Sequence, residues 1–133
     1  MRNIDIGSDG TLFDITSDQS YDVLVPVIID AASETRADAG AVSVATYDTK
    51  VTTTGAAAIT LADGTIKGQL KRIQLTSDGG DATLTIASPV SAALDVVTFA
   101  DVGDTVELIW NGTAWRILAA YNCADGTSAP AVA

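Results

Sequence analysis

Residues 106–118, VELIWNGTAWRIL, contain the clearest structural signal of the chain, because two β-type runs flank a single turn signal. The pair Asn111-Gly112 favours a two-residue type I′ turn, in which both central residues take positive φ. That turn sets the register of a β-hairpin. The expected cross-strand pairs are Trp110–Thr113, Leu108–Trp115, Glu107–Arg116 and Val106–Ile117.

This hairpin has one apolar face and one mixed face. The apolar face suits a core and carries Val106, Leu108, Trp110, Trp115 and Ile117. On the other face the Glu107–Arg116 ion pair is expected to contribute about 0.2–1 kcal/mol. Ile109 and Leu118 flank that pair on a side that otherwise meets water. They are either scattered surface apolar residues, which are normal, or part of a subunit interface.

Further β-rich runs of similar length precede the hairpin in the chain, and Asp-Gly, Gly-Gly and single-Gly turn signals separate many of them. Short strands with turns roughly every 8–12 residues are typical of a sandwich or barrel. The crossover helices of a parallel α/β fold are missing. The expected strands are Leu12–Thr16, Asp22–Ile29, Ala41–Tyr47, Ala57–Leu61, Gln69–Thr76, Ala82–Ile86, Val96–Phe99, Thr105–Trp110 and Thr113–Ala119.

The sequence therefore predicts an all-β protein with a single antiparallel β-sandwich or jelly-roll-like domain of about 8–9 short strands. A chain of 133 residues fits one such domain with additional end segments. We expect an N-terminal arm over residues 1–20, the sandwich over 21–122 and a flexible tail over 123–133. The stretch Asp30–Ala39 has no apolar stripe and is expected to be a loop with at most one helical turn.

The N-terminal third contains the most apolar run of the chain, VLVPVII at residues 23–29. Pro26 has no N–H and is confined to an edge strand or a covering arm, and an exposed apolar edge needs a partner. We therefore expect oligomerisation. The candidate subunit or capsid interface residues are Ile4, Ile6, Phe13, Val25, Pro26, Val27, Ile109 and Leu118.

The charge balance argues against nucleic acid as a partner. Seventeen acidic residues against seven basic ones give a net charge of −10, which repels a phosphate backbone. The one basic cluster, Lys67, Lys71 and Arg72, is interpreted as solvated charge. No stretch reaches the ~18 apolar residues that span a bilayer. The opening MRNIDIGSDG does not resemble a secretory signal, so we expect the chain to stay in the cytoplasm where it is made.

The residue types in the sequence do not indicate a catalytic site. The sequence has no His and a single cysteine, Cys123, so the usual base of a Ser triad and the common metal sites are missing. Asp78-Gly79-Gly80-Asp81 offers oxygen atoms to Ca²⁺, but a hairpin turn explains it better. We expect no enzyme activity, no catalytic residues, no metal and no cofactor.

Residues 58–121 resemble virion proteins of tailed bacteriophages, especially small β-rich capsid decoration (cement) proteins. The segments that carry the resemblance are ITLADGTIKGQLKRIQLTSDGGDATLTI and VVTFADVGDTVELIWNGTAWRIL. The resemblance implies a protein on the capsid exterior, commonly a homotrimer, that clamps neighbouring major capsid subunits after synthesis in the bacterial cytoplasm. The alternative is a head or tail fibre-associated module that binds a receptor or glycan.

Overall fold

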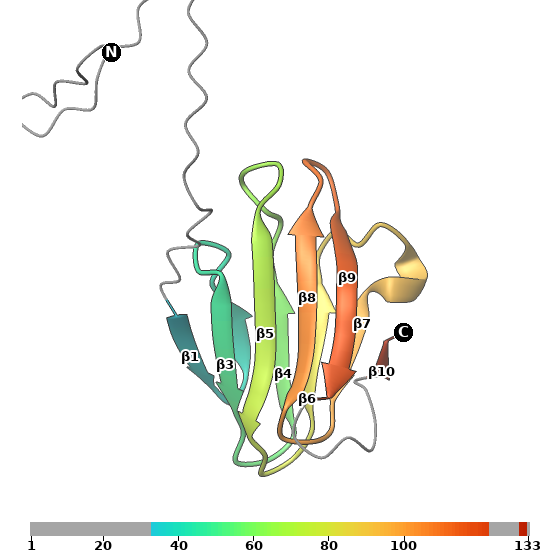
Figure 1. Ribbon diagram of the computed structural model, residues 1–133. Helices are drawn as coiled ribbons and strands as arrows, with labels where there is room; N and C mark the ends of the chain where they lie inside the picture. Colours follow the sequence, from blue (N-terminus) through green and yellow to red (C-terminus); the bar gives the residue numbers. More distant parts are fainter. Residues whose placement is uncertain (1–32, 123–130, 133) are drawn as a thin grey trace, which may run out of the picture.

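Two β-sheets packed face to face form the protein, which is represented by a computed structural model describing residues 33–122 and 131–132 (Figure 1). The front sheet has the order β1-β3-β5-β8-β9 and the back sheet the order β10-β7-β6-β4-β2. The front strands are β1 (Ser33–Ala37), β3 (Asp48–Thr52), β5 (Leu70–Ser77), β8 (Asp104–Trp110) and β9 (Trp115–Asn122). The back strands are β2 (Gly40–Val42), β4 (Ala57–Leu61), β6 (Ala82–Ile86), β7 (Val96–Phe99) and β10 (Ala131–Val132).

The strands β1 to β6 form a parallel coil. The chain alternates between the sheets, so β1, β3 and β5 stack in parallel in front and β2, β4 and β6 stack in parallel behind. A parallel connection within one sheet ordinarily needs a crossover of a dozen or more residues, commonly a helix. Here a strand of the opposite sheet serves as that crossover, so no helix is required.

The remaining strands pair in the antiparallel sense. β7 pairs with β6 and β10 in the back sheet, while β8 lies between β5 and β9 in the front sheet. A 3₁₀ turn, η1 (Ala92–Leu94), precedes β7. The Ser91 side chain caps this turn by accepting a hydrogen bond from the backbone N–H of Ala93. The all-β sandwich is confirmed, but the purely antiparallel, jelly-roll-like arrangement is wrong for β1 to β6.

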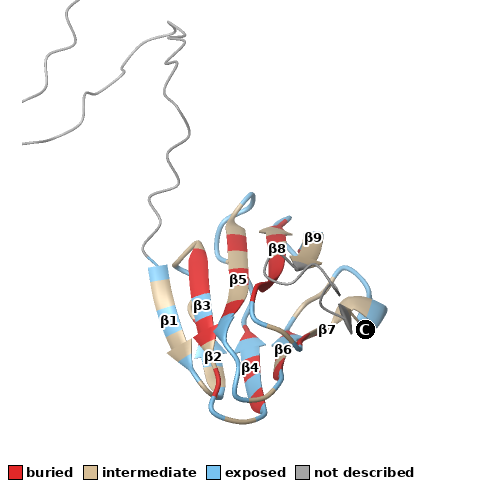
Figure 2. Ribbon diagram, turned by 60° about the horizontal axis from the view of Figure 1, so that its bottom comes forward, coloured by how far each residue is buried: buried red, intermediate tan, exposed pale blue. Residues whose placement is uncertain are grey.

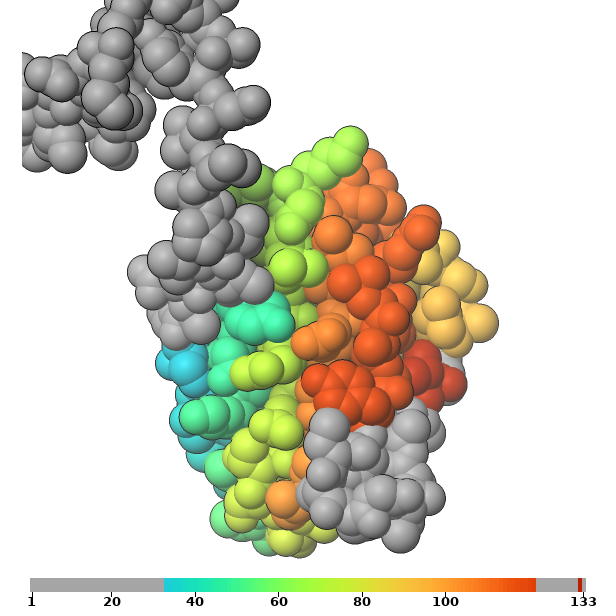
Figure 3. Space-filling view, viewed as in Figure 1, coloured from blue at the N-terminus to red at the C-terminus, as the bar shows by residue number. Residues whose placement is uncertain are grey.

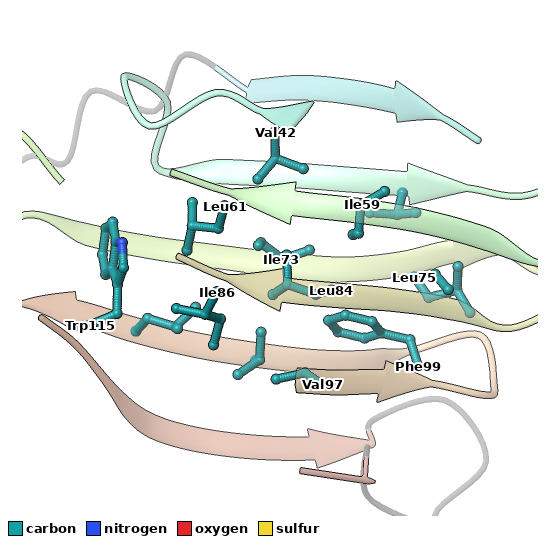
Figure 4. Packing of buried hydrophobic residues seen from close by; sticks show 14 of the residues in the cluster. Val42, Ile59, Leu61, Ile73, Leu75, Leu84, Ile86, Val97, Phe99 and Trp115 are labelled. Atoms are coloured by element: carbon teal, nitrogen blue, oxygen red, sulfur yellow. The ribbon is translucent and has the colours of Figure 1, made fainter. Parts of the chain in front are cut away.

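The core lies between the sheets because inward and outward side chains alternate along each strand. The alternation is plain along β4, where Ala57, Ile59 and Leu61 are buried and Ala58 and Thr60 are exposed (Figure 2). Aliphatic residues from both sheets interdigitate, with Phe99 near one end of the cluster and Trp115 near the other (Figure 4). An apolar interior of this kind is sufficient to hold the two sheets together.

The hairpin at Asn111-Gly112 exists, but its predicted register is wrong. The loop spans residues 111–114: the backbone N–H of Asn111 donates to the Ala114 carbonyl (3.0 Å), and the Asn111 side-chain oxygen accepts from the N–H groups of Thr113 and Ala114. This side-chain-closed turn replaces the type I′ turn. The observed pairs are therefore Trp110–Trp115, Ile109–Arg116 and Leu108–Ile117.

The same hairpin contains a β-bulge that sequence reasoning missed. The register shifts between Glu107 and Leu108, so that Glu107 lies opposite Ala119 rather than Arg116. The extra residue, Leu118, interrupts the alternation of β9. The predicted core face is nevertheless correct: Val106, Leu108, Trp110 and Trp115 are buried and Ile117 packs against them.

Two other expectations along the chain need correction. The stretch Asp30–Ala39 contains β1 rather than a loop, and the predicted strand Ala41–Tyr47 ends at Val42, after which β3 begins at Asp48. Strands such as β1 and β3 escape a search for apolar alternation because polar side chains occupy some of their inward positions. Of the predicted tail, Ala131–Val132 form β10; the arm at 1–20 and the strand Asp22–Ile29 lie outside the described residues.

Candidate interaction surface

The outer face of the front sheet carries the two predicted interface residues that the structure describes. Ile109 on β8 is half-buried, and Leu118 on β9 is 53 % exposed. The other six, Ile4, Ile6, Phe13, Val25, Pro26 and Val27, lie outside the described residues. Ile109 is the register partner of both Leu70 on β5 and Arg116 on β9.

An apolar band therefore crosses this face near the loop end of the hairpin. Leu70 and Ile109 are half-buried neighbours on adjacent strands, and the bulge leaves Leu118 protruding on the edge strand. Figure 3 shows this face, with the yellow-green β5 beside the orange β8 and β9. Cross-strand neighbours such as Leu70 and Ile109 lie about 4.5–5.5 Å apart at Cβ. Leu118 lies two residues along β9 from Arg116, the register partner of Ile109.

A network of charged and aromatic side chains lies next along the same strands. The Arg72 Nε–H donates to Asp48 Oδ1 at 2.8 Å, and its guanidinium lies 5.4 Å from the ring centroid of Tyr47. The Tyr47 hydroxyl donates to Glu107 (3.4 Å), which is the register partner of Arg72. The network thus links β3, β5 and β8 across the outer face of the front sheet.

The electrostatics of this network follow from its contacts. The hydrogen bond to Asp48 raises the pKa of Arg72 above its usual value. Burial, and next the nearby Glu107 carboxylate, raise the pKa of Tyr47. Because the side chain of Arg72 is 39 % exposed, its ion pair contributes little to stability, about 0–1 kcal/mol. Its main effect is to orient groups on the surface.

Lys71 was predicted to be solvated, and the structure shows that it is not. It lies on the inner face of β5, fully buried, and its ammonium donates to the Thr46 carbonyl at 2.9 Å and to the hydroxyls of Thr46 and Thr49. Burial lowers its pKa to about 8, although the Glu34 and Asp48 carboxylates act in the opposite direction. The period-2 pattern of Lys71, Ile73 and Leu75 was the available signal.

The end of the sandwich that holds the hairpin loop is closed around the two tryptophans. Their ring centroids lie 5.4 Å apart, and the Trp115 indole N–H donates to the Ala62 carbonyl at 2.9 Å. A Cβ on Gly64 would lie 2.4 Å from the Trp110 ring, so glycine is required there. Both rings face inward, as predicted, and they anchor the 62–69 connection against the hairpin.

The possible metal-binding groups are the next feature of the described residues. Within residues 33–122 and 131–132, no group of three or more His, Cys, Asp and Glu side chains is placed to hold a metal ion. The Asp78–Asp81 segment was predicted to be a hairpin turn, but it connects β5 and β6, which belong to opposite sheets. Within it, the Asp78 carboxylate accepts a hydrogen bond from the Gly80 N–H. No helix in this part of the chain is long and apolar enough to cross a membrane.

No protein-family model, curated protein or solved structure matches this chain.

Proposed function

We propose that this protein is a structural component of a phage virion that binds the outer surface of the capsid as a decoration protein. As a homotrimer it stabilises the contacts between neighbouring major capsid subunits. The resemblance of residues 58–121 to such proteins supports the proposal. So does the acidic balance of the chain, −10 overall, which suits a virion exterior rather than packaged DNA.

The observation that carries the proposal is the surface formed by Leu70, Ile109 and Leu118 beside the Arg72 network. Protein-binding surfaces combine a desolvated apolar centre with ordered polar groups at the rim. Leu118 supplies an exposed apolar side chain on an edge strand, and the network supplies oriented charges. We assign the capsid contact to this face.

The test uses capsids of the encoding virus prepared without this protein. Leu118→Asp places a charge in the apolar band, and Thr60→Asp places the same charge on the exposed outer face of the back sheet. We expect Leu118→Asp to weaken co-sedimentation by about 10-fold or more, as for a residue central to an interface. Thr60→Asp should bind and protect capsids against heat as the parent protein does.

Two outcomes contradict the proposal. Capsids that are neither bound nor stabilised by the parent protein exclude a decoration role. Equal binding by the parent protein and Leu118→Asp excludes the front face as the contact.

The Tyr47 ring favours a second candidate, a fibre-associated module that binds a receptor glycan. Sugars are commonly held by an aromatic ring with neighbouring carboxylates, and Tyr47 lies within the network of Arg72, Asp48 and Glu107. A glycan array separates the candidates: glycan binding that is lost in Tyr47→Ala, with no binding to capsids, supports this second function.

A further inference from the structure

The parallel coil begins at two strands whose outer edges have no partner among the described residues. β1 pairs with β3 alone and β2 with β4 alone, so one end of each sheet is open. An open edge presents a row of unpaired backbone N–H and C=O groups, which is a template for another strand.

The core beneath this end contains polar groups, and one of them lacks a partner within the described part of the chain. β1 directs Glu34 and Arg36 inward, in register with the buried Thr49 and Val51. The Glu34 carboxylate accepts from the Ser43 backbone N–H at 2.9 Å and from the Thr49 hydroxyl at 3.4 Å. The Nε of Arg36, in contrast, is buried without an acceptor. A buried N–H without an acceptor is costly, so the described residues leave this end of the core incompletely satisfied.

The spacing of the coil indicates where another strand would come from. Register partners on stacked strands are Ser33 and Asp48, Gly40 and Ile59, and Asp48 and Arg72. The number of residues between the two members of each pair is the length of chain that makes one full turn of the coil. The apolar run of residues 23–29 precedes β2 by a similar length of chain. The stretch from Val23 to Gly40, which would place Leu24 beside Ala41, falls within the range that those three pairs define.

The connection to β1 is also of suitable length. Residues 30–32 lie between the run and Ser33, and β1 itself reaches β2 through Asp38 and Ala39 alone. A chain that leaves the run therefore has enough length to cross from the back sheet to the front sheet. A connection this short also favours the same chain over a second copy, since it keeps the strand close to its edge.

We propose that Val23–Ile29 adds to the free edge of β2 in its own chain, as a further parallel strand of the back sheet. Backbone groups along a strand point alternately to its two edges. We place Pro26 toward the outer edge, where its missing N–H breaks no ladder hydrogen bond. Val23, Val25, Val27 and Ile29 then bond to β2. At the outer edge Pro26 also prevents further strands from adding.

This assignment gives the run a structural role. Its β-branched side chains at positions 23, 25, 27 and 29 share one face, which extends the core beyond Val42 and Arg36. Val25, Pro26 and Val27 are then occupied within the chain, and the contact proposed above rests on the front sheet.

Hydrogen exchange of the full-length protein tests whether the run is part of a sheet. We expect the amides of Val25, Val27 and Ile29 to exchange on the order of 100-fold or more slowly than those of residues 2–16. Exchange of the run at the rate of an unfolded peptide overturns the proposal.

Disulfide trapping identifies the edge and the chain. In a Cys123→Ser background, Ala41→Cys on the exposed face of β2 is combined with Leu24→Cys or Ile28→Cys, which are expected on the same face. Neighbouring strands place such pairs within disulfide reach. We expect a cross-link within one chain, seen as a faster band on a non-reducing gel. The matched control, Arg116→Cys on β9 in place of Ala41→Cys, should form none.

The alternatives give different bands. A protected run that cross-links two chains overturns the proposal in favour of strand exchange with a second copy. If the run is protected but neither Leu24→Cys nor Ile28→Cys cross-links with Ala41→Cys, the proposal is overturned in favour of another sheet edge. Circular dichroism of each variant confirms that it retains the parent β-sheet spectrum.

Discussion

The coil formed by β1 to β6 and the antiparallel part formed by β7 to β9 use the same alternation of inward and outward side chains, yet they pair differently. In the antiparallel part, β8 and β9 are neighbours in sequence and in space, joined by the loop at 111–114. In the coil, two strands that pair within one sheet are separated in the sequence by a strand of the opposite sheet. Examples are the strands that contain Ser33 and Asp48, and those that contain Ala57 and Ala82. Local turn chemistry thus controls one part, and contacts between turns and sheets control the other.

The largest effect is expected in the antiparallel part, at Trp115. This side chain is buried, packs near Trp110 and donates its indole N–H to Ala62. Trp115→Ala leaves a cavity and an unpaired carbonyl, and should cost about 3–5 kcal/mol of unfolding free energy in urea titrations. Arg116→Ala, at the exposed neighbouring position, is the control and should change little. A loss below about 1 kcal/mol for Trp115→Ala would show that the hairpin is not anchored by this ring.

The coil should show a pH dependence that comes from Lys71. Burial lowers its pKa from 10.5 to about 8, so between these values the unfolded chain binds more protons than the folded one. The free energy of unfolding should therefore rise from pH 7 to pH 10, by up to about 3 kcal/mol if the full shift is expressed. Above pH 10 the raised pKa of Tyr47 acts in the opposite direction.

Urea titrations at pH 7, 8, 9 and 10 measure this rise. Lys71→Met fills the same space without a charge and should abolish it, whereas Lys50→Met, at an exposed position of β3, should retain it. The same rise in Lys71→Met as in the parent protein contradicts the assignment to Lys71.

A smaller effect is expected where the turns of the coil stack. A Cβ on Gly79 would lie 2.7 Å from the Thr53 carbonyl oxygen, because the turn after β5 rests on the turn after β3. Gly79→Ala forces these backbones apart and should cost about 1–3 kcal/mol. Gly55→Ala has no atom within 4 Å of the new Cβ and should be neutral or slightly stabilising. Equal melting temperatures for the two variants would contradict the stacking of the turns.

The hairpin shows how far sequence reasoning reached. The apolar positions of β8 and β9 were correct because side-chain direction follows from strand period alone. The register was wrong because Asn111 closes a longer loop with its own side chain, and because the bulge at Leu118 depends on what the strand packs against. Residue types allow both turns, and only the surrounding contacts select one.

The candidate surface was predictable to a similar extent. Ile109 and Leu118 stood out as apolar residues on a face that should meet water. The network of Tyr47, Arg72 and Glu107 did not, because its members lie far apart in the sequence and meet only when β3, β5 and β8 align. The burial of Lys71 was missed as well, since its partners are Thr46, in the connection before β3, and Thr49, within β3, a strand that the sequence pattern does not reveal.

From the residues alone it was possible to predict that the protein is built from short strands, which side chains along most of them point inward, and that Trp110 and Trp115 belong to the core. These properties depend on local period and residue type. Three further properties follow only from tertiary contacts: β1 to β6 stack in parallel, Glu107 lies beside Arg72, and Lys71 is buried. Those outcomes depend on how two sheets stack, and a sheet accepts parallel or antiparallel neighbours with the same alternating pattern.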